Sequence, residues 1–339
     1  MKAVRRHLDH RADDAPPGPA ERGVVLLHVG GPDTEDAIEA FHLALWSDPA
    51  FAPRTLSSPF PRRRAEKEWA ARGDELRKRY GLIGGRSPVR DLLESQALAL
   101  ENRLLGRPVM ASRSSGPVRV VVGTVHGAPT MDEAAATLAA TGCRRVAVLP
   151  MYVHDDPSTT GRVVEAFERA WSTAGRPAPF AAARGVSGDP AFVEAMIGRV
   201  RRSIDLVPKD LRDDAFLLFT MHSPPESKVP RALMKEVEAT AQAIMTAVGY
   251  GEDRAAVAFQ SLGAPASILS PEVEEFAVER AKDGEQALIV APLSFVTDAF
   301  ETLQDLDIRV YQAAVEAGVK QYRRVPTLNA DPAFIDLLA

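Results

Sequence analysis

Short apolar runs recur along the chain, and each of them ends in residues that form loops. The first run, Val24–Val29, is closed by the two glycines and the proline at 30–32. A run of this kind predicts a buried strand. The same pattern predicts further strands at Val118–Val122, Arg145–Leu149, Ala215–Thr220 and Gln286–Ala291, with a shorter one at Val257–Phe259.

Helical patterns separate these strands. Asp33–Leu45 predicts a helix with Thr34 as its N-cap, the charge-rich Ala65–Tyr80 predicts a surface helix, and Asp91–Leu105 has its leucines and alanines at helical spacing. Unbroken apolar strands that alternate with helices indicate parallel sheets covered on both faces. We therefore expect an α/β fold.

Two segments of the chain resemble each other. Gly142–Tyr152 and Gly284–Ser294 keep the same register through a glycine, an apolar strand and a proline. One interpretation is that any two buried strands look alike. The other, which the shared register favours, is a pair of related α/β domains that face each other across a cleft.

Composition narrows the function classes. The chain has 339 residues, a net charge of -5 and one cysteine, Cys143. A single cysteine excludes an intrachain disulfide and a cysteine-held iron–sulfur cluster within one chain, and it fits a reducing compartment, so we expect a cytoplasmic protein. The charge argues against nucleic-acid binding. No apolar run approaches the roughly 20 residues of a transmembrane helix, while peripheral membrane contact stays open.

Ligands of parallel sheets bind beyond the carboxyl ends of the strands, so the loops there are the candidates for chemistry. These loops hold the side chains that suit a divalent metal or proton transfer, namely His28, His126, His154, Asp155, Asp156, His222, Asp298, Glu301 and Asp305. No tight zinc motif, phosphate loop, dinucleotide fingerprint or nucleophile elbow is present. Ser158–Gly161 could hold an anion at a helix N-terminus or simply cap the helix.

Glu301, Asp305 and Arg309 are spaced by four, which predicts one face of a helix. One interpretation is a solvated face with an Asp305–Arg309 ion pair. The other is a polar lane that carries cations or protons.

Several motifs, in their order along the chain, resemble those of ferrochelatases, from about Gly23 to the end. They are Tyr80–Pro88, Leu149–Tyr152 with Ser158–Gly161, Leu218–Glu226, Phe259–Ser261, Pro292–Asp307, Tyr322–Asn329 and Asp331–Phe334. The resemblance implies insertion of ferrous iron, the substrate metal, into protoporphyrin IX or coproporphyrin III. It implies two Rossmann-like domains whose parallel sheets face a porphyrin cleft, at 23–178 and 179–317, after a disordered tail at 1–22. Residues 318–339 are expected to pack back on the first domain.

The resemblance also implies roles for single residues. His222 corresponds to the histidine that accepts a proton, Glu301 to the glutamate that passes iron or protons, and both with Asp305 are expected to meet the metal. Substrate contacts are expected from the loops, at His126, Tyr152, Ser158, Thr159, Thr160, Ser223 and Pro224. Arg86 and Ser87 are further candidates for the propionates, and 51–60 for an apolar lip.

Departures from the family pattern keep other functions open. Thr124-Val125 stand where many members have Arg-Tyr, the glutamate motif reads Asp298-Ala-Phe-Glu301 without its histidine, and Arg309 stands where an acid is common. The missing Arg-Tyr pair, the missing histidine and the absence of the family's tryptophan after Gln260-Ser261 favour a tetrapyrrole-binding carrier or regulator with little catalysis, whereas the retained His222 and Glu301 oppose it. A chelatase for cobalt or nickel is a third hypothesis.

Overall fold

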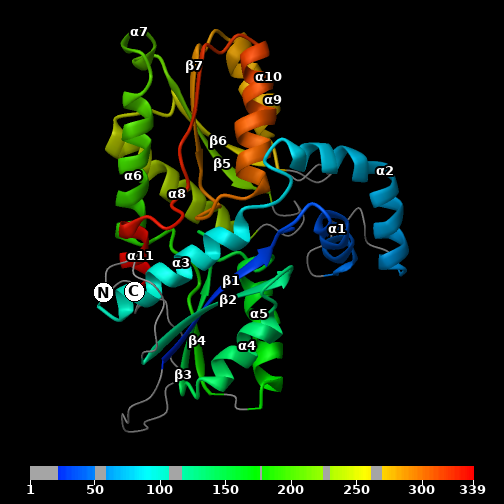
Figure 1. Ribbon diagram of the computed structural model, residues 1–339. Coiled ribbons are helices and arrows are strands. Elements are labelled where there is room, and N and C mark those ends of the chain that lie inside the picture. The colour runs from blue at the N-terminus through cyan, green and yellow to red at the C-terminus, as the bar shows by residue number, and fades with distance from the viewer. Residues whose placement is uncertain (1–21, 50–58, 107–116, 176–177, 224–229, 261–268) are drawn as a thin grey trace.

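The computed structural model describes residues 22–49, 59–106, 117–175, 178–223, 230–260 and 269–339. Within them it confirms the α/β fold, with two four-stranded parallel sheets (Figure 1). The first sheet has the order β2-β1-β3-β4, formed by β1 (Arg22–Gly30), β2 (Val118–His126), β3 (Arg145–Pro150) and β4 (Phe180–Ala182). The second has the order β6-β5-β7-β8, formed by β5 (Phe216–His222), β6 (Ala255–Gln260), β7 (Ala287–Pro292) and β8 (Gln321–Arg324).

The two sheets repeat one another, as the matching segments indicate. Each sheet has the first of its strands inside, the second at one edge and the fourth at the other. The loops after β2 and β6 also match, because Thr124 donates its backbone N–H to Pro129 at 2.8 Å and Phe259 donates to Pro271 at 2.9 Å. β3 and β7, the strands of the sequence repeat, therefore occupy equivalent places.

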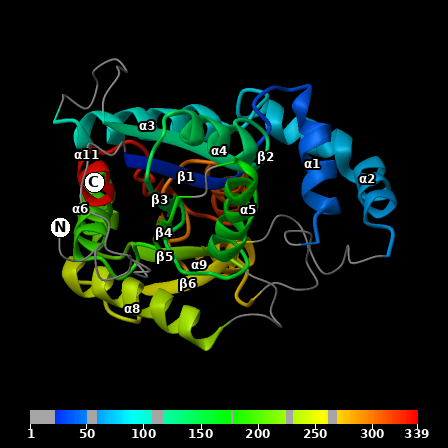
Figure 2. The same ribbon diagram turned by 90° about the horizontal axis from the view of Figure 1, so that it is seen from below.

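Helices cover both sheets. Those of the first half are α1 (Ala37–Ser47), α2 (Pro61–Gly81), α3 (Val89–Leu104), α4 (Met131–Ala140) and α5 (Thr160–Thr173). Those that follow are α6 (Pro190–Asp205), α7 (Lys209–Arg212), α8 (Arg231–Val248), α9 (Val273–Lys282), the π-helix η4 (Glu301–Val310), α10 (Tyr311–Glu316) and α11 (Pro332–Leu338). α1 and α2 project sideways from the body of the molecule (Figures 1 and 2).

Apolar side chains of both sheets meet in one continuous core. Leu26 and Val120 of the first sheet belong to the same buried cluster as Leu217 and Ile289 of the second. Helix α3 lies between the sheets in the view of Figure 1 and contributes Leu93 and Leu100 to that cluster. A separate cluster lies beneath α4 and α5, another beneath α9 and α10, and a small one joins α1 to α2.

The elements differ from the expectations at several ends. β4 belongs to the first sheet, so this sheet runs to Ala182, beyond the expected boundary at 178. β8 pairs with β7 in the second sheet, so residues 318–339 do not pack on the first domain as a whole. α11 contacts α3 as well as α6, and the Asn329 carbonyl before it accepts from Gln96 of α3. Thr34 lies before the N-cap Asp36, and its hydroxyl accepts from the Ala37 N–H at 3.2 Å. The expected tail and lip lie largely outside the described residues.

Candidate functional site

His222 is the last residue of β5, a strand that is otherwise fully buried. Its backbone N–H donates to the Ser294 hydroxyl at 2.9 Å, and its ring meets the Phe295 ring edge-on at 6.5 Å between centroids. The residue as a whole is half-buried. Desolvation by burial lowers the pKa of His222, and the Asp156 charge opposes this shift. The imidazole is therefore neutral at neutral pH and has a lone pair to accept a proton.

Glu301 is the first residue of η4 and is also half-buried. Burial raises the pKa of its carboxyl from 4.5 to about 7, and the nearby Asp305 charge adds to the shift. At neutral pH this carboxyl exists in both protonation states, which suits exchange of a proton or a cation.

Gln260 connects these two residues. It is fully buried at the end of β6, where it is the strand partner of His222. Its amide donates to the Glu301 carbonyl at 3.1 Å and accepts from the Thr220 hydroxyl at 2.9 Å. The ends of β5 and β6 therefore fix where η4 begins.

The helix that carries Glu301 is a π-helix, whereas the spacing by four predicts an α-helix face. In a π-helix each turn closes five residues apart, and such segments are frequent at functional sites. The predicted Asp305–Arg309 ion pair forms nevertheless, with Nε to Oδ1 at 3.5 Å. Local sequence spacing gives no signal for the wider helix.

Asp305 is buried and carries two guanidinium partners. Arg79 of α2 lies 2.6 Å from Oδ1, the oxygen that also faces Arg309. Arg309 in turn pairs with Glu272 at 3.3 Å and with Glu274. Among the described residues the second oxygen, Oδ2, has no hydrogen-bond partner. Arg79 is 226 positions away in sequence, so sequence reasoning had no signal for this contact.

Tyr152 links the two sheets. Its hydroxyl accepts from the Val29 N–H at 2.9 Å, its ring stacks on His28 at 5.1 Å, and its backbone bridges to Phe295. Phe295 thus contacts both Tyr152 and His222. Burial raises the pKa of the Tyr152 hydroxyl, with smaller contributions from Glu301 and Asp156.

The serine and threonines after Tyr152 bond within their own loop. The Asp156 carboxylate accepts from the Ser158 N–H at 2.8 Å, from the Ser158 hydroxyl at 2.7 Å and from the Thr159 hydroxyl at 3.4 Å. The Thr160 hydroxyl donates to the His154 carbonyl at 2.7 Å. Thr159 is the N-cap of α5 but makes no side-chain cap bond. Asp156 thus organises the loop and places its charge near His222 and Tyr152.

The remaining expected substrate residues lie on other strand ends. His126 ends β2 and has its Nε2 at 3.4 Å from Asp48, beside the ring of Phe41. The Ser223 hydroxyl accepts from the Leu269 N–H at 3.0 Å. Pro224 lies outside the described residues.

The two additional propionate candidates behave differently from each other. Arg86 pairs with Asp91 at 2.6 Å and stays largely exposed. Ser87 is buried, and its N–H donates to the Pro32 carbonyl at 2.8 Å.

Among the described residues, no group of three or more His, Cys, Asp or Glu side chains has the arrangement of a metal site. Nor does any helix found there have the length and apolarity to cross a bilayer.

The chain is similar to known proteins both in structure and in sequence. SirB from Bacillus subtilis, solved with Fe3+, matches with a TM-score of 0.52 and 11% identity, over 93% of this chain and 92% of that one, which shows the fold alone. A ferrochelatase of Geotalea uraniireducens is 32% identical over 330 residues, 95% of this chain and 97% of the relative. One of Thermosynechococcus vestitus is 32% identical over 328 residues, 94% of this chain and 81% of the relative.

The family model agrees with these relatives over almost the whole length. The model described as Ferrochelatase matches residues 21–339, a range that includes both sheets and the loops at their strand ends. The chain belongs to the ferrochelatase family, lyases that insert ferrous iron into porphyrins.

Proposed function

We propose that this chain is an active ferrochelatase for protoporphyrin IX or coproporphyrin III, with His222 as proton acceptor and Glu301 as the residue that passes iron or protons. One observation supports this most: Gln260, the buried strand partner of His222, donates to the backbone carbonyl of Glu301, whose carboxyl has a pKa of about 7.

The proton balance assigns a role to His222. A free porphyrin carries two pyrrole N–H protons, and Fe²⁺ insertion releases both as the metal takes their place. One ring nitrogen of His222 takes up such a proton because burial keeps the imidazole neutral beforehand. The buried Asp156 charge nearby stabilises the imidazolium that results.

Glu301 would handle the cation and the other proton. In its ionised form the carboxylate binds Fe²⁺ as a hard-oxygen ligand. Transfer of the metal to the porphyrin nitrogens then leaves the carboxylate free to take up the second pyrrole proton, which its raised pKa favours. Asp305 acts mainly on charge, because Arg79 and Arg309 already face one of its oxygens while its field raises the pKa of Glu301.

Anaerobic mixing tests the function directly. The protein is mixed with Fe²⁺ and, separately, with protoporphyrin IX and coproporphyrin III, and the metalloporphyrin bands are followed. We expect turnover of one of the two, which also identifies the substrate. A bound porphyrin spectrum without turnover supports the carrier or regulator instead, and turnover only with Co²⁺ or Ni²⁺ supports a chelatase for another metal.

The role of His222 is tested by His222→Ala. General acid–base groups contribute about 100-fold or more to a rate, so we expect turnover to fall by at least that factor. Porphyrin affinity, measured by fluorescence quenching, should change little. His42→Leu is the matched control, since His42 is buried among rings of α1 and α2 and should leave turnover unchanged. Wild-type turnover in His222→Ala would disprove the assignment.

A further inference from the structure

Asn329 lies on the path from β8 to α11 and has an unusual backbone. Its φ of 45° is the single positive value among the described non-glycine residues. Asparagine tolerates this left-handed conformation better than most residues, but it still costs energy that the surrounding structure must offset. Such conformations cluster where a segment holds a functional part in place.

All polar groups of Asn329 form hydrogen bonds, and most of these bonds are to the loop after β7. Its backbone N–H donates to Val296 at 2.7 Å, its side-chain oxygen accepts from the Asp298 N–H at 2.9 Å, and its side-chain amide donates to Asp298 Oδ2 at 2.9 Å. Its carbonyl accepts from Gln96 of α3 at 2.9 Å. Asn329 therefore joins the first half of the chain to the loop that leads into η4.

Asp298 connects Asn329 to the first residues of η4, where Glu301 lies. Its Oδ1 accepts from the Thr302 hydroxyl at 3.0 Å and from Arg324 at 3.0 Å. Thr302 follows Glu301 directly and is fully buried. The start of η4 is thus held through Asp298 on one side and through Gln260 on the other.

We propose that Asn329 is a positioning residue for Glu301: it fixes the Asp298 turn so that the Glu301 carboxyl meets the metal in one orientation. The proposal rests on the role of Glu301 in the proposed function. The chemistry needs such support, because a displacement of about 1 Å at a reacting group costs on the order of 100-fold in rate. The Glu301 carboxyl accepts a hydrogen bond from its own backbone N–H, a local bond that fixes the carboxyl only as firmly as the start of η4 is fixed.

Two variants separate the backbone from the bonds. Asn329→Gly keeps the left-handed conformation and removes both side-chain bonds to Asp298. Asn329→Asp also accepts this conformation but puts a second carboxylate oxygen against Asp298 Oδ2. For both we expect kcat/KM for Fe²⁺ to fall by about tenfold or more, while KM for the porphyrin stays unchanged. If Asn329 only stabilised the fold, its substitution would affect the kinetic constants for Fe²⁺ and for the porphyrin alike.

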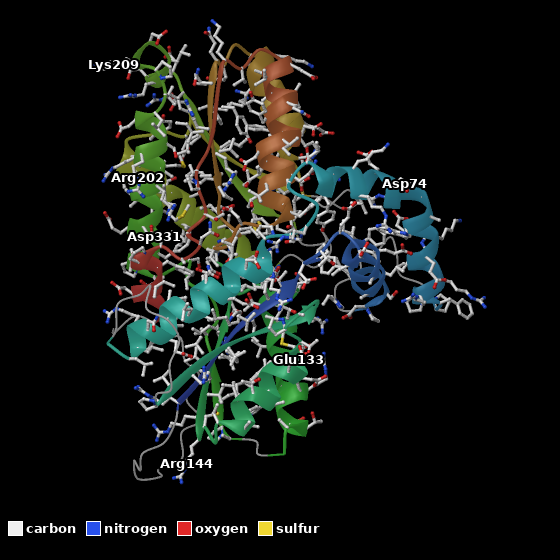
Figure 3. The ribbon with its side chains drawn as sticks, in the orientation of Figure 1. Asp74, Glu133, Arg144, Arg202, Lys209 and Asp331 are labelled. Atoms are coloured by element: carbon white, nitrogen blue, oxygen red, sulfur yellow. The ribbon has the colours of Figure 1, made fainter. Side chains whose placement is uncertain are left out.

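Asp331→Ala is the matched control. Asp331 caps α11 through the Ala333 N–H at 2.9 Å and pairs with Arg199 of α6 at 2.7 Å, at the junction visible in Figure 3. Its loss loosens the same segment without touching Asp298. We expect a lower Tm for this variant with unchanged constants for Fe²⁺, measured well below that Tm.

The results distinguish the positioning role of Asn329 from the role of Glu301 itself. The positioning role alone would be overturned if Asn329→Gly and Asn329→Asp kept the wild-type kcat/KM for Fe²⁺ while Glu301→Gln was inactive. Wild-type turnover in Glu301→Gln would overturn the role of Glu301 itself. Equal losses for Fe²⁺ in Asp331→Ala and the Asn329 variants would reduce Asn329 to general stability. If Asn329→Gly fails to fold, Asn329→Asp alone carries the test.

Discussion

The carboxyl of Glu301 couples folding to pH, because its pKa is raised from 4.5 to about 7. Between these two values the folded protein keeps a proton that the unfolded chain releases. The contribution to stability is therefore fully present below about pH 4.5 and is lost as the pH rises through about 7.

Glu301→Gln removes this coupling, since a glutamine stays neutral at every pH. We expect the variant to gain stability relative to the wild type as the pH rises from 5 to 8, by on the order of 1–2 kcal/mol after allowance for partial exposure. Urea unfolding at a series of pH values measures it. Wild-type and variant curves that run parallel would show that the carboxyl titrates normally.

At the residue scale, the sequence indicates which side chains are candidates for the site more readily than it indicates which residues they contact. His222 and Glu301 could be singled out because each follows a strand and belongs to a recognisable motif. Gln260 could have been found from its place at the end of a strand beside that of His222. Arg79 could not, since its contact with Asp305 depends on how α2 packs against η4 and on nothing local to either segment.

At the scale of elements, the packing of α1 on α2 encloses a histidine that has no polar partner. His42 contacts the rings of Trp46, Trp69 and Tyr80, and neither ring nitrogen has a hydrogen-bond partner among the described residues. Burial lowers its pKa from 6.5 to about 3, and Arg72 and Arg79 add to the shift. The charged form is therefore excluded from the folded state until the pH is very low.

This predicts a loss of stability in acid that His42→Leu relieves. Between about pH 3 and 6.5 the unfolded chain binds a proton that the folded chain rejects, so stability rises with pH in that window. We expect His42→Leu, a change of similar volume, to be more stable than the wild type at pH 5 and nearly neutral at pH 8. Thermal unfolding at both pH values decides, and an equal effect at the two would contradict the buried neutral imidazole.

The elements themselves were predictable where burial alone forms them. The central strands are continuous apolar runs, and the expected ranges lie within a few residues of β1, β3, β5 and β7. The edge strands β4 and β8 were missed because three residues, or the polar run Gln321–Arg324, carry no strand pattern. The helix expected at Ala65–Tyr80 is present, but it also buries Leu76 and Tyr80 against α1, which its charge content conceals.

At the scale of the whole molecule, the two sheets share one core. The buried cluster that contains Leu26 also contains Phe219, and it includes Phe334 of α11 near the end of the chain. The repeated topology could be predicted from the matching segments, but the fused core could not, because it depends on the relative orientation of the sheets. Neither half can lose its packing without exposing apolar surface of the other.

The shared core predicts one cooperative unfolding transition. Differential scanning calorimetry should give a single peak whose van't Hoff and calorimetric enthalpies agree. The Asp331→Ala variant, which weakens α11 at the junction of α3 and α6, should shift that peak as a whole. Two resolved transitions in the wild type would mean that the sheets unfold as separate domains.

The hydrogen bonds between Asn329 and Asp298 bear on when a newly synthesised molecule becomes able to handle iron. The strands β1 to β7 and Glu301 all precede Asn329 in the chain, so during synthesis Asp298 is present before the amide that holds it. On the proposed role of Asn329, efficient handling of iron by Glu301 would begin only once Asn329 has docked on Asp298.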